Sequence, residues 1–321
     1  MEKEAFRKRL DNLLESYKSN GKKDIVFVQV GRAGTGKSTF INSVLGKEMA
    51  ETSHRAKSCT KVARKYSLKT DQDLPLDLVI WDTPGLASKD TQAETDLRFL
   101  KDIKEVDLLI ICVDAANPRL DAEISKFISA INKNVLNDSP IWKHCMFVLT
   151  KANLLRNPFD NEETTDVGYF TKAVEQLTEG CKELLQEHKV KSASEIPIVP
   201  IGSFRDKVLA NGQAWLPEFW VRAIERATDA GKAYILAANE EQFSTGKVIF
   251  KREQIKKIIE FIKKPIVSKA LIITLVAAAA TIGAAVGLPF LGPVGAAVGA
   301  GIGAGVGLVT KVFSSILVKR S

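Results

Sequence analysis

The chain has 321 residues, of which 45% are hydrophobic. This length fits one large domain with an appendage, or two small domains, and it is enough for a sizeable core. Its formal net charge of +8 is concentrated, because residues 242–269 hold eight Lys or Arg and two Glu. A local cluster of this kind argues against a protein coated by nucleic acid and favours a local anionic partner.

The first 21 residues are expected to form an amphipathic helix. Phe6, Leu10, Leu13, Leu14 and Tyr17 share one helical stripe, which indicates a helix docked on the following domain. The segment is charged from its second residue, which is not typical of a secretory signal peptide. The four cysteines are not at metal-ligand spacing, so we expect reduced structural thiols in a cytosolic domain.

A phosphate-binding loop is predicted after the apolar run 25–30. GRAGTGKS, residues 31–38, has the spacing G-x-x-x-x-G-K-S between an expected strand and an expected helix. Backbone N–H groups of such a loop, together with the helix N-terminus, favour a bound phosphate. Lys37 is expected to reach the β- and γ-phosphates, and the Ser38 hydroxyl to bind Mg²⁺. The predicted nucleotide-binding residues of this segment are Gly31, Arg32, Ala33, Gly34, Thr35, Gly36, Lys37, Ser38 and Thr39.

The second half of the phosphate site is predicted in VIWDTPG. Asp82 ends the apolar run 78–82 and is expected to help hold Mg²⁺, while Gly85 can offer its N–H to the γ-phosphate. Thr60, in KSCT, is expected to complete the magnesium shell and so to take part in catalysis when the γ-phosphate is present. The alternatives are a strand followed by a Pro-Gly turn, and a surface threonine.

The expected base-binding loops follow two later strands. Thr150-Lys151-Ala152-Asn153 stands where guanine-binding proteins carry Asn-Lys-x-Asp, with the Lys151 stem on the ring. The Asn153 oxygen accepts one guanine proton, but its NH₂ opposes the second donor, so weaker base selectivity is expected and an Asp at this position should sharpen it. An ATPase is the alternative. In IPIVPIGS, backbone N–H groups near Gly202 and Ser203 are expected to face the base oxygen.

The order of these segments predicts the fold class. Apolar runs at 25–30, 78–82, 106–113, 145–149 and 196–201 alternate with helix-like segments, which favours an α/β domain with a doubly wound, mostly parallel sheet over residues 22–235. KVARKYSL, residues 61–68, suits an edge strand.

Several motifs together resemble a known family. GRAGTGKSTFINSVLG, KSCT, WDTPGL, IWKHCMFVLTKAN and WLPEFW are similar, in this order, to the immunity-associated (avirulence-induced-gene type) GTPases, which are relatives of septins and of chloroplast import-receptor GTPases. The resemblance covers about residues 24–235. It implies a switch that binds GTP or GDP with Mg²⁺ and dimerises across its nucleotide faces.

The resemblance also bears on catalysis. Arg119, in NPRLDAEISKF, matches an Arg-containing segment of these relatives, so a partner's Arg119 is a candidate for stabilising transition-state charge. The alternative is an ordinary surface arginine at a helix start. Leu86 follows Gly85 where small GTPases carry a water-orienting Gln, so slow hydrolysis by an isolated protomer is expected.

The remainder of the chain is expected to meet a membrane. Residues 236–269 are predicted to form a basic amphipathic linker helix suited to anionic lipids. Residues 270–310 contain no charged residue and no His, and they are broken at 287–293, which predicts a hydrophobic α-helical hairpin within 270–321. Gly295, Gly299, Gly303 and Gly307 recur every fourth residue, as in close-packed membrane helices.

The charges that flank this hairpin predict its orientation. Lysines precede and follow it, which favours both ends on the cytosolic face of an intracellular membrane. A soluble helical hairpin and an unstructured Ala-Gly tail are the structural alternatives for this region, and a solvated helix packed on the nucleotide domain is the alternative for the basic linker helix. A membrane-perturbing effector, in which the hairpin acts and the nucleotide domain gates assembly, is the functional alternative to a switch.

Overall fold

The computed structural model describes residues 2–45, 64–68, 74–82, 106–117, 122–132, 140–156, 166–203 and 206–239. The chain divides into two compact units, one of residues 14–234 and the other of residues 1–13 with 235–321. The unit of residues 14–234 contains the whole sheet and every candidate site residue that the structure describes.

Six strands form one sheet in the order β2-β3-β1-β4-β5-β6. All neighbouring pairs are parallel except β2 and β3, which are antiparallel at one edge. The predicted doubly wound, mostly parallel α/β domain is therefore confirmed, and the predicted edge strand is found as β2. The strands are β1 (Asp24–Gly31), β2 (Arg64–Leu68), β3 (Asp77–Asp82), β4 (Leu108–Asp114), β5 (Cys145–Thr150) and β6 (Ile198–Pro200).

The central strands are apolar along their whole length. β4 reads LLIICVD and β5 reads CMFVLT, and every residue of the two is buried except Asp114. A continuous apolar run of this kind is typical of parallel strands that are covered on both faces, because side chains pointing either way enter the core.

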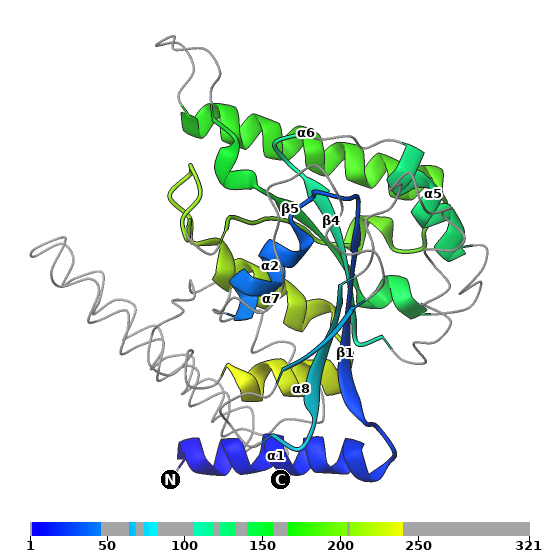
Figure 1. Cartoon of the computed structure of the whole chain (residues 1–321), viewed down its shortest axis with the longest axis vertical. Helices are drawn as coiled ribbons and strands as arrows, with labels where there is room; N and C mark the ends of the chain where they lie inside the picture. Colours follow the sequence, from blue (N-terminus) through cyan, green and yellow to red (C-terminus); the bar gives the residue numbers. More distant parts are fainter. Residues whose placement is uncertain are drawn as a thin grey trace, which may run out of the picture. The chain divides into compact units, whose positions relative to one another are not determined.

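Helices cover both faces of this sheet (Figure 1). α2 (Lys37–Leu45) and α7 (Trp215–Arg226) lie together on one face, where the rings of Phe40 and Phe219 meet at a centroid distance of 5.0 Å. α5 (Ala122–Ala130) and α6 (Asp166–Glu187) lie on the other, and Ser125 hydrogen-bonds His188 at 2.6 Å. The 3₁₀ turns are η2 (Pro140–His144), η3 (Ala152–Leu154) and η4 (Ala193–Glu195).

The predicted N-terminal helix is present as α1 (Glu2–Ser19), and α8 (Asp229–Ala238) is the last described helix. Within the unit that contains residues 1–13 and 235–321, Arg7 pairs with Asp11 at 3.0 Å and donates a hydrogen bond to the carbonyl oxygen of Ala237 at 3.4 Å.

Strand register gathers polar residues at one edge of the sheet. Parallel pairing places Gln29 opposite Asp82, and it places Asp114 opposite Thr150. β1 ends at Gly31, the first residue of the predicted phosphate loop. The carboxyl ends of parallel strands in open α/β sheets form the usual ligand-binding edge, and here they carry the predicted site.

Some expectations concern residues outside those the structure describes. Thr60, Gly85, Leu86 and Arg119 are among them, as are residues 240–321, which contain most of the predicted linker helix and the whole predicted hairpin. Within the described ranges, every helix falls short of the length or apolar character needed to cross a bilayer.

Candidate nucleotide-binding site

The loop from Gly31 to Gly36 turns tightly between β1 and α2. Gly34 and Gly36 have φ angles of 80° and 83°, a conformation that is costly for residues with a Cβ. The Thr35 hydroxyl and the Thr35 N–H both donate to the Arg32 carbonyl oxygen, at 2.9 and 3.3 Å. Helix α2 starts directly afterwards at Lys37, so its positive N-terminal end adjoins the loop.

Lys37 lies beneath this loop and is only 7% exposed. Its Nζ donates to the carbonyl oxygens of Gly31 and Arg32, at 2.9 and 3.0 Å. Burial lowers the pKa of Lys37, and the nearby charge of Asp82 opposes that effect. A bound polyphosphate would add negative charge beside the ammonium and stabilise its charged form further.

Ser38 and Asp82 meet where the sequence predicts magnesium. The Ser38 hydroxyl donates to Oδ2 of Asp82 at 2.8 Å, and Asp82 is fully buried. A hydroxyl beside a carboxylate supplies the hard oxygen ligands that Mg²⁺ prefers, with phosphate oxygens and water completing the shell. No cluster of three or more His, Cys, Asp or Glu with metal-binding geometry occurs among the described residues. Ser38 and Asp82 are thus two oxygen ligands suited to a Mg²⁺ ion that also binds phosphate.

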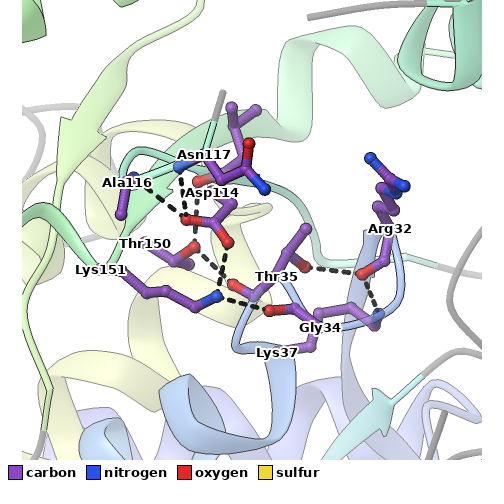
Figure 2. A network of polar contacts seen from close by, with 10 residues as sticks. Arg32, Gly34, Thr35, Lys37, Asp114, Ala116, Asn117, Thr150 and Lys151 are labelled. Carbon is purple, nitrogen blue, oxygen red and sulfur yellow. Dashed lines mark hydrogen bonds and ion pairs between the residues drawn. The ribbon is translucent and has the colours of Figure 1, made fainter. Parts of the chain in front are cut away.

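Thr150 and Lys151 connect the end of β5 to the phosphate loop (Figure 2). The Thr150 hydroxyl lies 2.5 Å from the Thr35 carbonyl oxygen and 3.0 Å from that of Val113. Nζ of Lys151 donates to the Gly34 carbonyl oxygen at 2.7 Å. These contacts place the predicted base-binding lysine across the phosphate loop.

Asp114, the last residue of β4, holds Lys151 in this position. Its Oδ2 lies 2.5 Å from Nζ of Lys151, and its Oδ1 accepts hydrogen bonds from the backbone N–H groups of Ala116 and Asn117 (Figure 2). Sequence reasoning assigned no role to Asp114 or to the Thr150 hydroxyl. The available signal was an Asp at the end of an apolar strand that neighbours the strand ending in Thr150.

The two predicted base loops are joined through the backbone. Ala152 N–H donates to the Ile201 carbonyl oxygen at 3.0 Å, and Ile201 N–H donates to that of Leu149 at 2.9 Å. Nδ2 of Asn153 donates to Oδ2 of Asp206 at 2.8 Å. The structure thus brings Lys151, Asn153, Gly202 and Ser203 to one side of the site, as the sequence predicts, and adds Asp206, which the sequence analysis did not single out.

Comparison with known proteins shows which class of protein has this architecture. A family model described as "50S ribosome-binding GTPase" matches residues 26–151, the span from β1 to Lys151. The chain is a P-loop GTPase. Its nucleotide is therefore GTP or GDP with Mg²⁺, which agrees with the sequence prediction.

Several curated proteins resemble the GTPase. Translocase of chloroplast 34 from Pisum sativum is 26% identical over 252 residues, covering 73% of this chain and 76% of that protein. The Translocase of chloroplast 34 homolog of Chlamydomonas reinhardtii is 23% identical over 241 residues, covering 70% of this chain but only 59% of that protein. Immune-associated nucleotide-binding protein 13 from Arabidopsis thaliana is 32% identical over 89 residues, or 28% of this chain and 26% of that protein. The predicted relationship to the import-receptor GTPases is thus confirmed, whereas membership of the immunity-associated family stays a prediction.

A solved structure shares the fold of the GTPase. It is described as "Dimerization is important for the GTPase activity of chloroplast translocon components atToc33 and psToc159". It aligns with a TM-score of 0.51 and 21% identity, covering 73% of this chain and 90% of that chain. At this identity the likeness shows the fold alone.

Proposed function

We propose that this protein is a GTP-dependent switch that acts at a membrane, hydrolyses GTP slowly as a monomer, and hydrolyses it faster when two GTPase domains face each other. The observation that carries the proposal is the continuous network from base side to phosphate side, in which Thr150 and Lys151 contact the carbonyl oxygens of Thr35 and Gly34. A nucleotide bound here would contact connected residues from its base to its phosphates.

Different residues of this site bind different parts of the nucleotide and its metal ion. Lys37 and the loop N–H groups hold phosphate oxygens, Ser38 and Asp82 are placed to hold Mg²⁺, and Lys151 supports the base. When bound, Mg²⁺ neutralises charge that develops on the phosphates during hydrolysis.

Binding is tested with the full chain and fluorescent GDP in the presence of Mg²⁺. Lys37→Ala should lose most of the affinity, because the substitution removes the buried ammonium that faces the phosphates. Lys191→Ala, at an exposed position in the turn that precedes β6, serves as the control and should bind normally. Unchanged GDP affinity in Lys37→Ala would show that this loop is not the nucleotide site.

Slow hydrolysis is supported by Leu86, since a Leu side chain cannot orient water. The description of the solved structure that shares this fold states that dimerisation is important for the GTPase activity of atToc33 and psToc159. In the proposed dimer, Arg119 of one protomer would stabilise charge in the site of the other. The resemblance to the immunity-associated GTPases also implies this role for Arg119. We include in the proposal that the chain belongs to that family.

The dimer mechanism predicts that hydrolysis per protomer rises with protein concentration. Arg119→Ala should slow hydrolysis and spare GTP binding, while a mixture of Arg119→Ala and Lys37→Ala chains should recover part of the rate. In that mixture the Lys37→Ala chain still supplies Arg119 but holds no GTP. A rate that is independent of concentration, together with normal hydrolysis by Arg119→Ala, would exclude the mechanism.

Membrane attachment is supported by sequence features of the C-terminal region. Residues 242–269 carry the excess of Lys and Arg, and residues 270–310 carry no charge. We propose that these segments bind anionic lipid on the cytosolic face of an intracellular membrane. Full-length protein should float with liposomes containing anionic lipid, and a chain that ends near residue 240 should not. Flotation of the shortened chain would contradict this assignment.

The regular glycines of the hairpin favour the membrane-perturbing effector as a second candidate, since close helix packing can also build an assembly within the bilayer. Dye-filled liposomes distinguish the two functions. A switch should bind them and leave them sealed, whereas the effector should release dye when GTP is added.

A further inference from the structure

The loop that follows β6 presents a second polar group beside Asn153. Oδ2 of Asp206 accepts the amide hydrogen bond of Asn153 at 2.8 Å and that of the Ser203 hydroxyl at 2.9 Å. Among the residues that the structure describes, no hydrogen bond reaches Oδ1, the other oxygen of this carboxylate, and Asp206 is exposed. A charged acceptor thus lies next to the residue that occupies the base-reading position.

The position of Asp206 is fixed by contacts of its backbone. The indole N–H of Trp215, which is 3% exposed, donates to the Asp206 carbonyl oxygen at 2.9 Å. The Asp206 N–H donates to the Ser203 carbonyl oxygen at 3.1 Å. A Cβ at Gly202 would come within 2.4 Å of the Asp206 carbonyl oxygen, so this close approach requires glycine. These contacts hold the Asp206 backbone in one place, so its carboxylate is preorganised beside Asn153.

This contact also fixes which way the Asn153 amide faces. Its NH₂ must point to Asp206, because the opposite orientation would set the amide oxygen against a carboxylate oxygen. The amide oxygen then faces away from Asp206 and can accept a proton. Asn153 and Asp206 together can present two acceptor oxygens, whereas Asn153 alone presents one acceptor and one opposing donor.

Guanine needs two such acceptors. Its N1–H and its 2-amino group are adjacent donors, while adenine offers an acceptor at N1 and no 2-amino group. We propose that Asp206 is a specificity-determining residue of the GTPase, and that Oδ1 of Asp206 and the amide oxygen of Asn153 form the acceptor pair for the guanine edge. The inference rests on the proposed GTP binding at this site, and it places on a second loop the carboxylate that the Asn-Lys-x-Asp motif would place at position 153.

The geometry reverses one expectation from sequence. Asp at position 153 would lie against Asp206, and two carboxylates in contact repel each other. Asn153→Asp alone should therefore weaken guanine binding instead of sharpening it. Asn153→Asp combined with Asp206→Asn keeps one carboxylate and one amide in contact and should recover most of the GDP affinity.

The experiment measures the affinities of the full-length chain for GDP and ADP, by competition with fluorescent GDP in the presence of Mg²⁺. Asp206→Ala should lower GDP affinity about ten- to a hundredfold, the range for losing a charge-assisted hydrogen bond, and leave ADP affinity unchanged. Glu187→Gln, which removes one exposed negative charge from α6, is the matched charge control and should alter neither affinity.

The outcomes separate this inference from the proposed function. Unchanged affinities for both GDP and ADP in Asp206→Ala would overturn the role of Asp206. An equal loss of both affinities would also overturn it, and would indicate a merely structural contact. In either case GDP binding that depends on Lys37 would leave the proposed function standing. Failure of the double variant to recover GDP affinity would also contradict the paired-acceptor arrangement.

Discussion

Thr150 is buried, and its hydroxyl lies within hydrogen-bonding distance of the carbonyl oxygens of Thr35 and Val113. Thr150→Val keeps the shape of the side chain but removes its only donor. We expect it to lower the free energy of unfolding by about 1–3 kcal/mol, the cost of leaving a buried carbonyl unsatisfied. GDP affinity should fall as well, because the phosphate loop loses its tie to β5. Urea unfolding and GDP titration check both effects.

Thr150→Ser is the matched control for this prediction, since it keeps the hydroxyl and loses only a methyl group. It should retain most of the GDP affinity. Equal GDP affinities for the Val and Ser variants would show that the hydroxyl does not hold the phosphate loop.

At the residue scale, the sequence could predict what a local motif specifies. Lys37, Ser38 and Asp82 were expected to act together, and the structure places them as neighbours. The roles of Asp114 and Asp206 could not be predicted, because they arise from the pairing of β4 with β5 and from the folding of a loop onto Trp215. Such contacts between distant segments leave no spacing pattern in the sequence.

Helix α7 supports the phosphate site through packing. Phe219 is 1% exposed and meets Phe40 of α2 edge to face, with a centroid distance of 5.0 Å and an interplanar angle of 79°. Phe219→Ala should destabilise the protein by about 3–5 kcal/mol, the usual cost of deleting a buried aromatic side chain. Thermal or urea unfolding measures the loss.

Phe219→Leu provides the comparison, because it fills much of the same space and should cost clearly less than Phe219→Ala. If the Ala variant unfolds at the same urea concentration as the unaltered chain, the α2–α7 contact contributes no stability.

At the scale of the elements, the sequence could predict that a strand with a strong apolar run exists, but it predicted the residues at which the strand begins and ends less accurately. The run 106–113 was expected as a strand, and β4 occupies Leu108–Asp114. The shift brings Asp114 into the strand as its last residue, where it faces Thr150 in register. The run 196–201 shortens to Ile198–Pro200, since strand length depends on pairing with β5 and not on apolarity alone.

Across the whole molecule, the thiols that the structure describes are buried and free of disulfides. Burial raises the pKa values of Cys112 and Cys181 to about 12 and raises that of Cys145 too. A raised pKa leaves almost no thiolate at pH 8, so these three cysteines should resist a thiol-specific reagent in the native protein. In guanidinium chloride all four cysteines should react. Rapid native labelling of Cys112 would contradict the packing around β4.

At this scale the sequence also predicts a basic linker helix and a hydrophobic hairpin. They follow from charge and composition over residues 236–321, most of which lie outside the described part of the chain. They stay predictions, and liposome flotation is their direct test.

The indole of Trp215 has a practical consequence. Its N–H is bonded to the backbone of the residue proposed to read the base, and indole emission is sensitive to the loss of such a bond. The protein therefore carries an intrinsic optical reporter at its base loop. A change in tryptophan emission on adding GDP that disappears in Trp215→Phe would let nucleotide exchange be followed in real time, without a labelled nucleotide.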